Sequence, residues 1–62
     1  MKPKEIVNII RDSGLSDNEI ARKTGLSQPT ITRIRNGQAD VRLSTVNKLM
    51  ELYTQLYERA ST

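Results

Sequence analysis

The chain has 62 residues, with ten Lys and Arg against seven Asp and Glu, a formal net charge of +3, and neither cysteine nor histidine. A chain this short buries only about 60% of its unfolded surface, so residues 1–62 form a single domain that needs efficient helix packing or a partner. The missing residue types exclude disulfides, thiolate metal sites and the commonest general base, and the acids are scattered. We therefore predict no enzyme, no metal, no cofactor and no small-molecule substrate.

The chain holds no run of about 18 apolar residues, and Glu5 interrupts its apolar N-terminal stretch. We therefore expect a cytoplasmic protein with no membrane partner. The sequence pI near 9.7 is consistent with a polyanionic partner. Ribosomal and membrane-surface proteins have a similarly modest excess of positive charge. The positions of the charges therefore say more about the partner than the net charge does.

The first predicted helix covers residues 3–13. Pro3 fits the first turn of a helix, where its missing N–H is not needed. Ile6, Ile9 and Ile10 then follow at helical spacing, with polar residues between them. This pattern is typical of an amphipathic helix that buries one face.

The tripeptide Gly-Leu-Ser occurs twice, at residues 14–16 and 25–27. We expect the same geometry in both copies. The glycine adopts the left-handed conformation that closes a helix, the leucine packs back on that helix, and the serine caps the next one. The repeat therefore predicts two joints between three consecutive helices.

The two capping serines differ in the residue three positions downstream. Glu19 lies three positions after Ser16, which predicts a capping box. Thr30 lies three positions after Ser27, so only the serine half of that motif is present. The third helix closes at Asn36, directly before a glycine. These signals predict short helices over residues 17–24 and 28–36.

A longer helix is predicted after a loop over residues 38–41. Its start lies between Arg42 and Thr45, and apolar residues then follow a helical rhythm that allows either one helix to about residue 59 or a break near 52–54. The residues of this rhythm are Leu43, Val46, Leu49, Met50, Tyr53, Leu56 and Tyr57. The fold class is therefore all-α, a compact bundle of four to five helices.

Two segments, LSDNEIARKTGLSQPTITRIRNG and LSTVNKLMEL, resemble the helix-turn-helix of the lambda-repressor/Cro-like (Xre-type) DNA-binding family. The resemblance covers about residues 5–52. It implies a sequence-specific transcriptional regulator, a repressor of the Cro type, that binds a double-stranded DNA operator as a homodimer. It also implies that helix 28–36 is the recognition helix, which enters the major groove.

The resemblance implies base contacts from the exposed side of the recognition helix, at Gln28, Pro29, Thr30, Thr32 and Arg33. Gln28 can pair with an adenine edge, and Arg33 with guanine. Phosphate contacts are expected at the helix N-termini, at the end of the recognition helix and from nearby arginines. These residues are Ser16, Asn18, Ser27, Arg35, Asn36 and Arg42.

Three residues depart from the family pattern. Asp17 stands where relatives often carry a glutamine, and an anion there would repel phosphate. Ile10 and Arg35 stand where relatives often pair an arginine with a glutamate, so that pair is absent and Arg35 is expected to be free for solvent or phosphate. Pro29 can offer only an apolar contact, for instance to a thymine methyl group.

The only aromatic residues, Tyr53 and Tyr57, lie with Leu56 near the C-terminus. We predict that these three residues form a dimer interface on a helix over residues 50–60, because the apolar stripe runs past the length of the bundle. Alternatively, they complete the core of the monomer. An alternative function is an antitoxin-type or other protein-binding module that uses this C-terminal helix.

Overall fold

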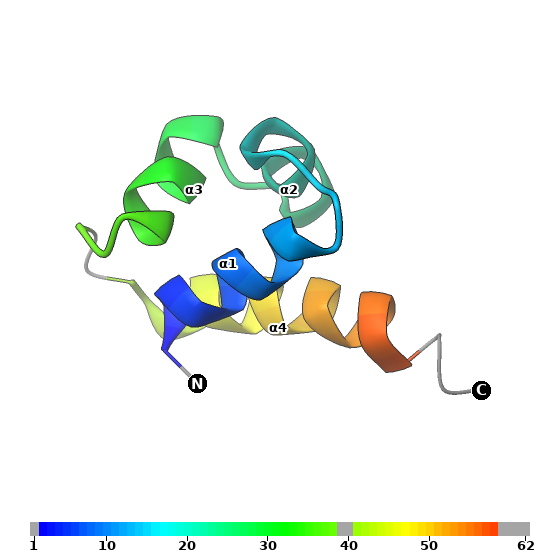
Figure 1. The fold of residues 1–62 in the computed structure, drawn as a ribbon. Helices are drawn as coiled ribbons and strands as arrows, with labels where there is room; N and C mark the ends of the chain where they lie inside the picture. Colours follow the sequence, from blue (N-terminus) through cyan, green and yellow to red (C-terminus); the bar gives the residue numbers. More distant parts are fainter. Residues whose placement is uncertain (1, 39–40, 59–62) are drawn as a thin grey trace.

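The computed structural model describes residues 2–38 and 41–58, which form four helices and no strand. The helices are α1 (Pro3–Asp12), α2 (Asp17–Thr24), α3 (Gln28–Arg35) and α4 (Leu43–Glu58) (Figure 1). The all-α prediction is confirmed for these residues, but the upper count of five helices is too high. The last helix runs unbroken through residues 52–54, which is the first of the two predicted alternatives, and it contains neither glycine nor proline. Residue 59, its predicted end, lies outside the described residues.

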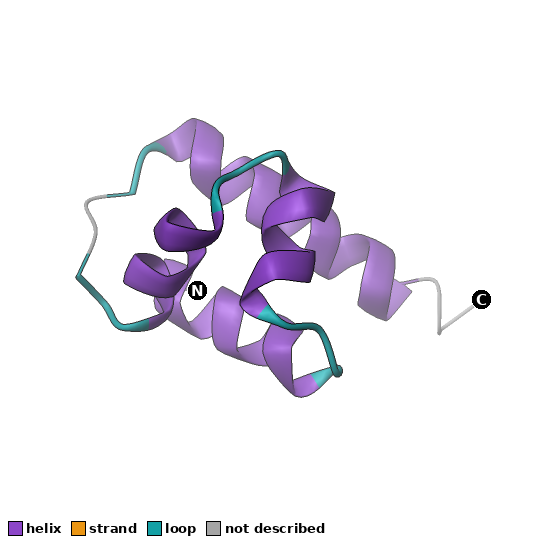
Figure 2. Ribbon diagram, turned by 90° about the horizontal axis from the view of Figure 1, so that it is seen from above, coloured by secondary structure: helices purple, strands orange, loops and turns teal. Residues whose placement is uncertain are grey.

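The helices α3 and α4 both pack against α1 and α2. In Figure 1, α4 runs beneath α1, and α3 lies on the side of the molecule away from α4. The C-terminal turns of α4 extend beyond the other three helices in both views (Figures 1 and 2). As a result, α3 is held from one side only and keeps an outer face without a protein neighbour among the described helices.

The core takes side chains from all four helices. Its buried apolar residues are Ile6, Val7, Ile10, Ile20, Ala21, Ile31, Ile34, Leu49 and Leu52. Each isoleucine that is fully removed from water contributes about 1.5–3 kcal/mol. The helix periodicity therefore predicted the inward face of α1 correctly at Ile6 and Ile10, whereas Ile9 is only half-buried.

Both Gly-Leu-Ser joints have the predicted left-handed glycine, packed leucine and capping serine, but their helix ends differ in detail. At the second joint Gly25 has φ +77° and ψ +12°, and the N–H of Leu26 donates to the carbonyl of Ala21 at 3.1 Å. At the first joint Gly14 has φ +110°, and its N–H donates to the carbonyl of Arg11 at 2.9 Å. The difference arises because α1 already ends at Asp12, two residues before its glycine, whereas α2 continues up to Gly25.

Both serine caps form as predicted. Ser16 Oγ accepts from the backbone N–H of Glu19 at 3.2 Å, and Glu19 Oε1 accepts from the backbone N–H of Ser16 at 3.2 Å. Ser27 Oγ accepts from the backbone N–H of Thr30 at 3.3 Å without a reciprocal carboxylate. The caps satisfy N–H groups that the helix itself leaves unpaired and thereby place the first turns of α2 and α3.

Candidate nucleic-acid interface

The outer face of α3 is defined by its two buried residues. Ile31 and Ile34 are almost fully removed from solvent. Gln28, Pro29 and Arg33 are exposed on the same helix. Arg33 makes no ion pair with any residue in the described part of the chain. The packing of α3 therefore leaves an amide, a pyrrolidine ring and a guanidinium group accessible to a partner.

The two threonines predicted to contact bases already make hydrogen bonds within the protein. Thr30 Oγ1 lies 2.7 Å from Ser27 Oγ, where either hydroxyl can donate. Thr32 Oγ1 accepts from Gln28 Nε2 at 2.8 Å and is half-buried. These internal hydrogen bonds use part of the donor and acceptor capacity of the two hydroxyl groups, so less of it is left for contacts to DNA.

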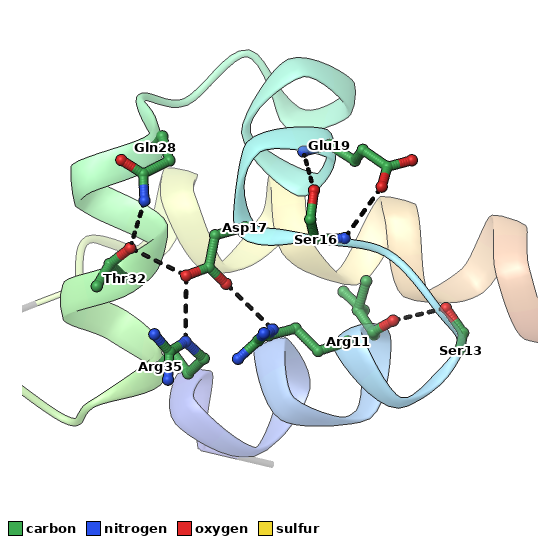
Figure 3. A network of polar contacts seen from close by, with 9 residues as sticks. Arg11, Ser13, Ser16, Asp17, Glu19, Gln28, Thr32 and Arg35 are labelled. Atoms are coloured by element: carbon green, nitrogen blue, oxygen red, sulfur yellow. Dashed lines mark hydrogen bonds and ion pairs between the residues drawn. The ribbon is translucent and has the colours of Figure 1, made fainter.

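Asp17, the first residue of α2, links three helices (Figure 3). Its Oδ2 accepts from Thr32 Oγ1 at 3.0 Å and from Arg35 Nε at 3.2 Å. Its Oδ1 lies 3.2 Å from Arg11 Nε in an ion pair. The side chain of Asp17 is only 12% exposed, whereas those of Arg11 and Arg35 are 40% and 29% exposed. The carboxylate therefore lies inside the molecule between two more exposed cations.

This arrangement corrects the expectation that Arg35 is free. Arg11 on α1 and Arg35 on α3 both form ion pairs with Asp17 on α2. With two guanidinium groups and one carboxylate the cluster has a net positive charge, so the carboxylate presents less repulsion to a nearby phosphate than an isolated anion would. Ile10 is buried, as expected from its apolar side chain.

Arg11 is the residue of this cluster that the sequence interpretation missed. The available signal was the joint departure of Asp17 and Arg35 from the family pattern. An anion and a cation that both depart from the pattern are candidates for an ion pair with each other. Because Asp17 and Arg35 were considered separately, no partner was sought for Asp17 and Arg11 was given no role. Because two of the three residues lie 18 positions apart in the chain, their proximity depends on the way α2 and α3 pack.

Apart from Arg35, which is paired with Asp17, the predicted phosphate contacts fall into two groups. Ser16 and Ser27 are exposed and serve as helix caps. Asn18, Asn36 and Arg42 are exposed on the first turn of α2, after α3 and before α4. No hydrogen bond or ion pair among the described residues connects Arg42 to the cluster around Asp17. These residues remain predicted phosphate contacts.

The predicted dimer residues contact α1 of the same chain and the core. Tyr57 donates its hydroxyl to the carbonyl of Ile9 at 3.0 Å, and its ring centroid lies 4.9 Å from that of Tyr53. Tyr53 and Leu56 are half-buried against the core, and Tyr57 keeps 40% of its surface exposed. The stripe thus contributes to the monomer, and its role in a dimer stays a prediction. Residues 59 and 60 of the predicted dimerisation helix lie outside the described residues.

Within the described residues, no group of three or more acidic side chains is arranged to hold a metal ion. None of the helices formed by residues 2–38 and 41–58 has the length and apolar character needed to cross a membrane.

Comparison with known proteins links the chain to a family of DNA-binding domains. The model of the Cro/C1-type HTH DNA-binding domain matches residues 5–54. Protein P2 of Acyrthosiphon pisum secondary endosymbiont phage 1 is 44% identical over 55 residues, which cover 87% of this chain. The match covers 58% of that phage protein, whose name states no activity. No solved structure matches the chain.

Proposed function

Because the chain belongs to the Cro/C1-type helix-turn-helix DNA-binding family, we propose that it is a sequence-specific transcriptional regulator that acts as a Cro-like repressor in the cytoplasm. In this proposal α3 enters the major groove of operator DNA. The observation that carries it is the exposure of Gln28, Pro29 and Arg33 on a helix whose other side is anchored in the core. A helix fits the major groove, where each base pair presents its own pattern of donors and acceptors.

Base recognition is assigned to the exposed side chains of α3. The amide of Gln28 can make paired hydrogen bonds to adenine, and the guanidinium group of Arg33 can do so with guanine. Pro29 offers an apolar contact to a thymine methyl group. Thr30 and Thr32 complete the predicted set, through those parts of each side chain that their internal hydrogen bonds leave available.

Phosphate contacts orient α3 in the groove. The N-termini of α2 and α3 carry partial positive charge and exposed serines, which suits them to bind phosphate. Asn18 and Asn36 can donate amide hydrogens, and Arg35 and Arg42 supply positive charge. Contacts of this kind position a protein on DNA without reading its sequence.

The proposal includes a homodimer, since one domain of this size reads only about half of a typical operator. Two copies related by a two-fold axis would place their α3 helices in half-sites about 34 Å apart. Tyr53, Leu56 and Tyr57 are the proposed interface. The projection of α4 beyond the other helices and the partial exposure of Tyr57 support this assignment (Figure 1).

Selection of bound duplexes from a random pool tests the function. The wild type is expected to enrich a palindromic consensus. Gln28→Ala and Arg33→Ala should each lose preference at one base pair per half-site, at a cost of about 1–3 kcal/mol for that base. Lys23→Ala is the matched control, because Lys23 is exposed in the last turn of α2, has no assigned DNA contact and should leave the preference at every base pair unchanged. Failure of the wild type to enrich any consensus would contradict the proposal, and equal losses on all duplexes would show that the two side chains contact only the backbone.

A further inference from the structure

A chain of hydrogen bonds runs from the first residue of α2 to the exposed start of α3. Asp17 Oδ2 accepts from Thr32 Oγ1 at 3.0 Å, and the same Thr32 oxygen accepts from Gln28 Nε2 at 2.8 Å. Figure 3 shows the three side chains joined one after another by dashed lines, with the amide oxygen of Gln28 pointing away from Thr32. The residue proposed to read a base is therefore connected to a carboxylate that lies behind the interface.

The chemistry of the three side chains determines which group donates and which accepts in each of these hydrogen bonds. The Asp17 carboxylate is paired with Arg11 and Arg35 and accepts hydrogen bonds without donating any. The hydroxyl of Thr32 has one hydrogen, which must go to that carboxylate, so its oxygen can only accept from the other side. The amide of Gln28 has to present its nitrogen to Thr32. Its oxygen then faces outward.

The donors and acceptors that the Gln28 amide presents to the outside determine which base it can pair with. An outward oxygen beside the remaining N–H offers an acceptor next to a donor, which matches the N6 amino group and N7 of adenine. The reversed amide would offer two N–H groups, which match the two acceptors of guanine, O6 and N7. We propose that Asp17 is a positioning residue that sets the adenine preference of Gln28 through the Thr32 hydroxyl.

This inference rests on the proposed function, and it is tested through base preference instead of affinity. The probe is a set of four duplexes that differ only at the base pair identified as losing discrimination in Gln28→Ala. We expect the wild type to favour adenine there by roughly tenfold. Asp17→Ala and Thr32→Val should each reduce that ratio below about threefold, because either change frees the amide to reverse.

The combination of variants separates this role from a general loss of structure. The double variant Asp17→Ala, Thr32→Val should lose no more preference than either single variant, because both interrupt the same chain of bonds. Arg11→Gln is the matched control. It removes one ion pair of Asp17 but leaves the bonds to Thr32 and Gln28 in place, so the preference for adenine should persist.

The outcomes distinguish the two proposals. If the wild type discriminates among the four duplexes and Gln28→Ala does not, the proposed function stands. If Asp17→Ala and Thr32→Val then keep the adenine preference of the wild type, the role of Asp17 is overturned. NMR of the free wild type provides a test that needs no variant. A nuclear Overhauser effect between the amide protons of Gln28 and the side chain of Thr32 is expected, and its absence would also overturn the inference.

Discussion

The joint between α2 and α3 can be tested with Gly25→Ala. Gly25 has φ +77° and ψ +12°, and no atom lies within 4 Å of the position that an added Cβ would occupy. The methyl group therefore meets no neighbour, and the cost comes from the left-handed backbone alone, about 1–2 kcal/mol. Alanine also restricts the unfolded chain, which offsets about 0.4–1 kcal/mol. The net loss should be about 1 kcal/mol, equivalent to a fall in Tm of about 4–8 °C for a domain of this size.

Thermal and urea unfolding followed by circular dichroism measure this loss. Gly25→Asn is the matched control, because asparagine tolerates the left-handed region better than alanine and should lose less stability. A Gly25→Ala variant as stable as the wild type would refute the reasoning, since the positive φ would then carry no cost. A loss above about 3 kcal/mol would refute it in the other direction, because strain at one residue does not account for it.

Three further predictions concern the core, the dimer and the DNA complex. Ile31→Ala should cost about 2–5 kcal/mol, a large part of the total stability of a domain this small, so circular dichroism should show a partly or fully unfolded chain; native-like melting would contradict the burial of this side chain. Sedimentation equilibrium should give a dimer for the wild type and a monomer for Tyr57→Ala, and a monomeric mass for both would remove the proposed dimer. The logarithm of the DNA-binding constant should fall linearly with the logarithm of salt concentration, by a slope of about −0.9 per phosphate neutralised, and a flat response would count against DNA as the partner.

The elements were predictable because their signals are local. Ser16 with Glu19 and the two Gly-Leu-Ser joints place helix ends within one or two residues of the observed ones. The matched family model confirms the resemblance read from residues 15–37 and 43–52. The count of helices was less certain, because the apolar rhythm of α4 fits one helix or two. The structure decides between the two, since α4 runs without a break from Leu43 to Glu58.

The charge network was not predictable in the same way, because its bonds join separate helices. Asp17 interacts with Thr32 and Arg35 across 15 and 18 positions of the chain. The departure of Asp17 from the family pattern was visible in the sequence, but its partners Arg11, Thr32 and Arg35 were not. Which partner meets a buried carboxylate depends on the angle between α2 and α3, and no local propensity determines that angle. The two joints share their predicted features, but the sequence did not show that α1 ends two residues before its glycine whereas α2 ends directly before its own.

The most direct test of the central claim is an NMR titration of the wild-type protein with a duplex that carries its selected consensus. We predict that the largest amide shift changes occur at the start of α2 and along α3, residues 16–19 and 27–36. Changes confined to α4, over residues 43–58, would contradict this prediction and would favour a protein-binding module over a DNA-reading one.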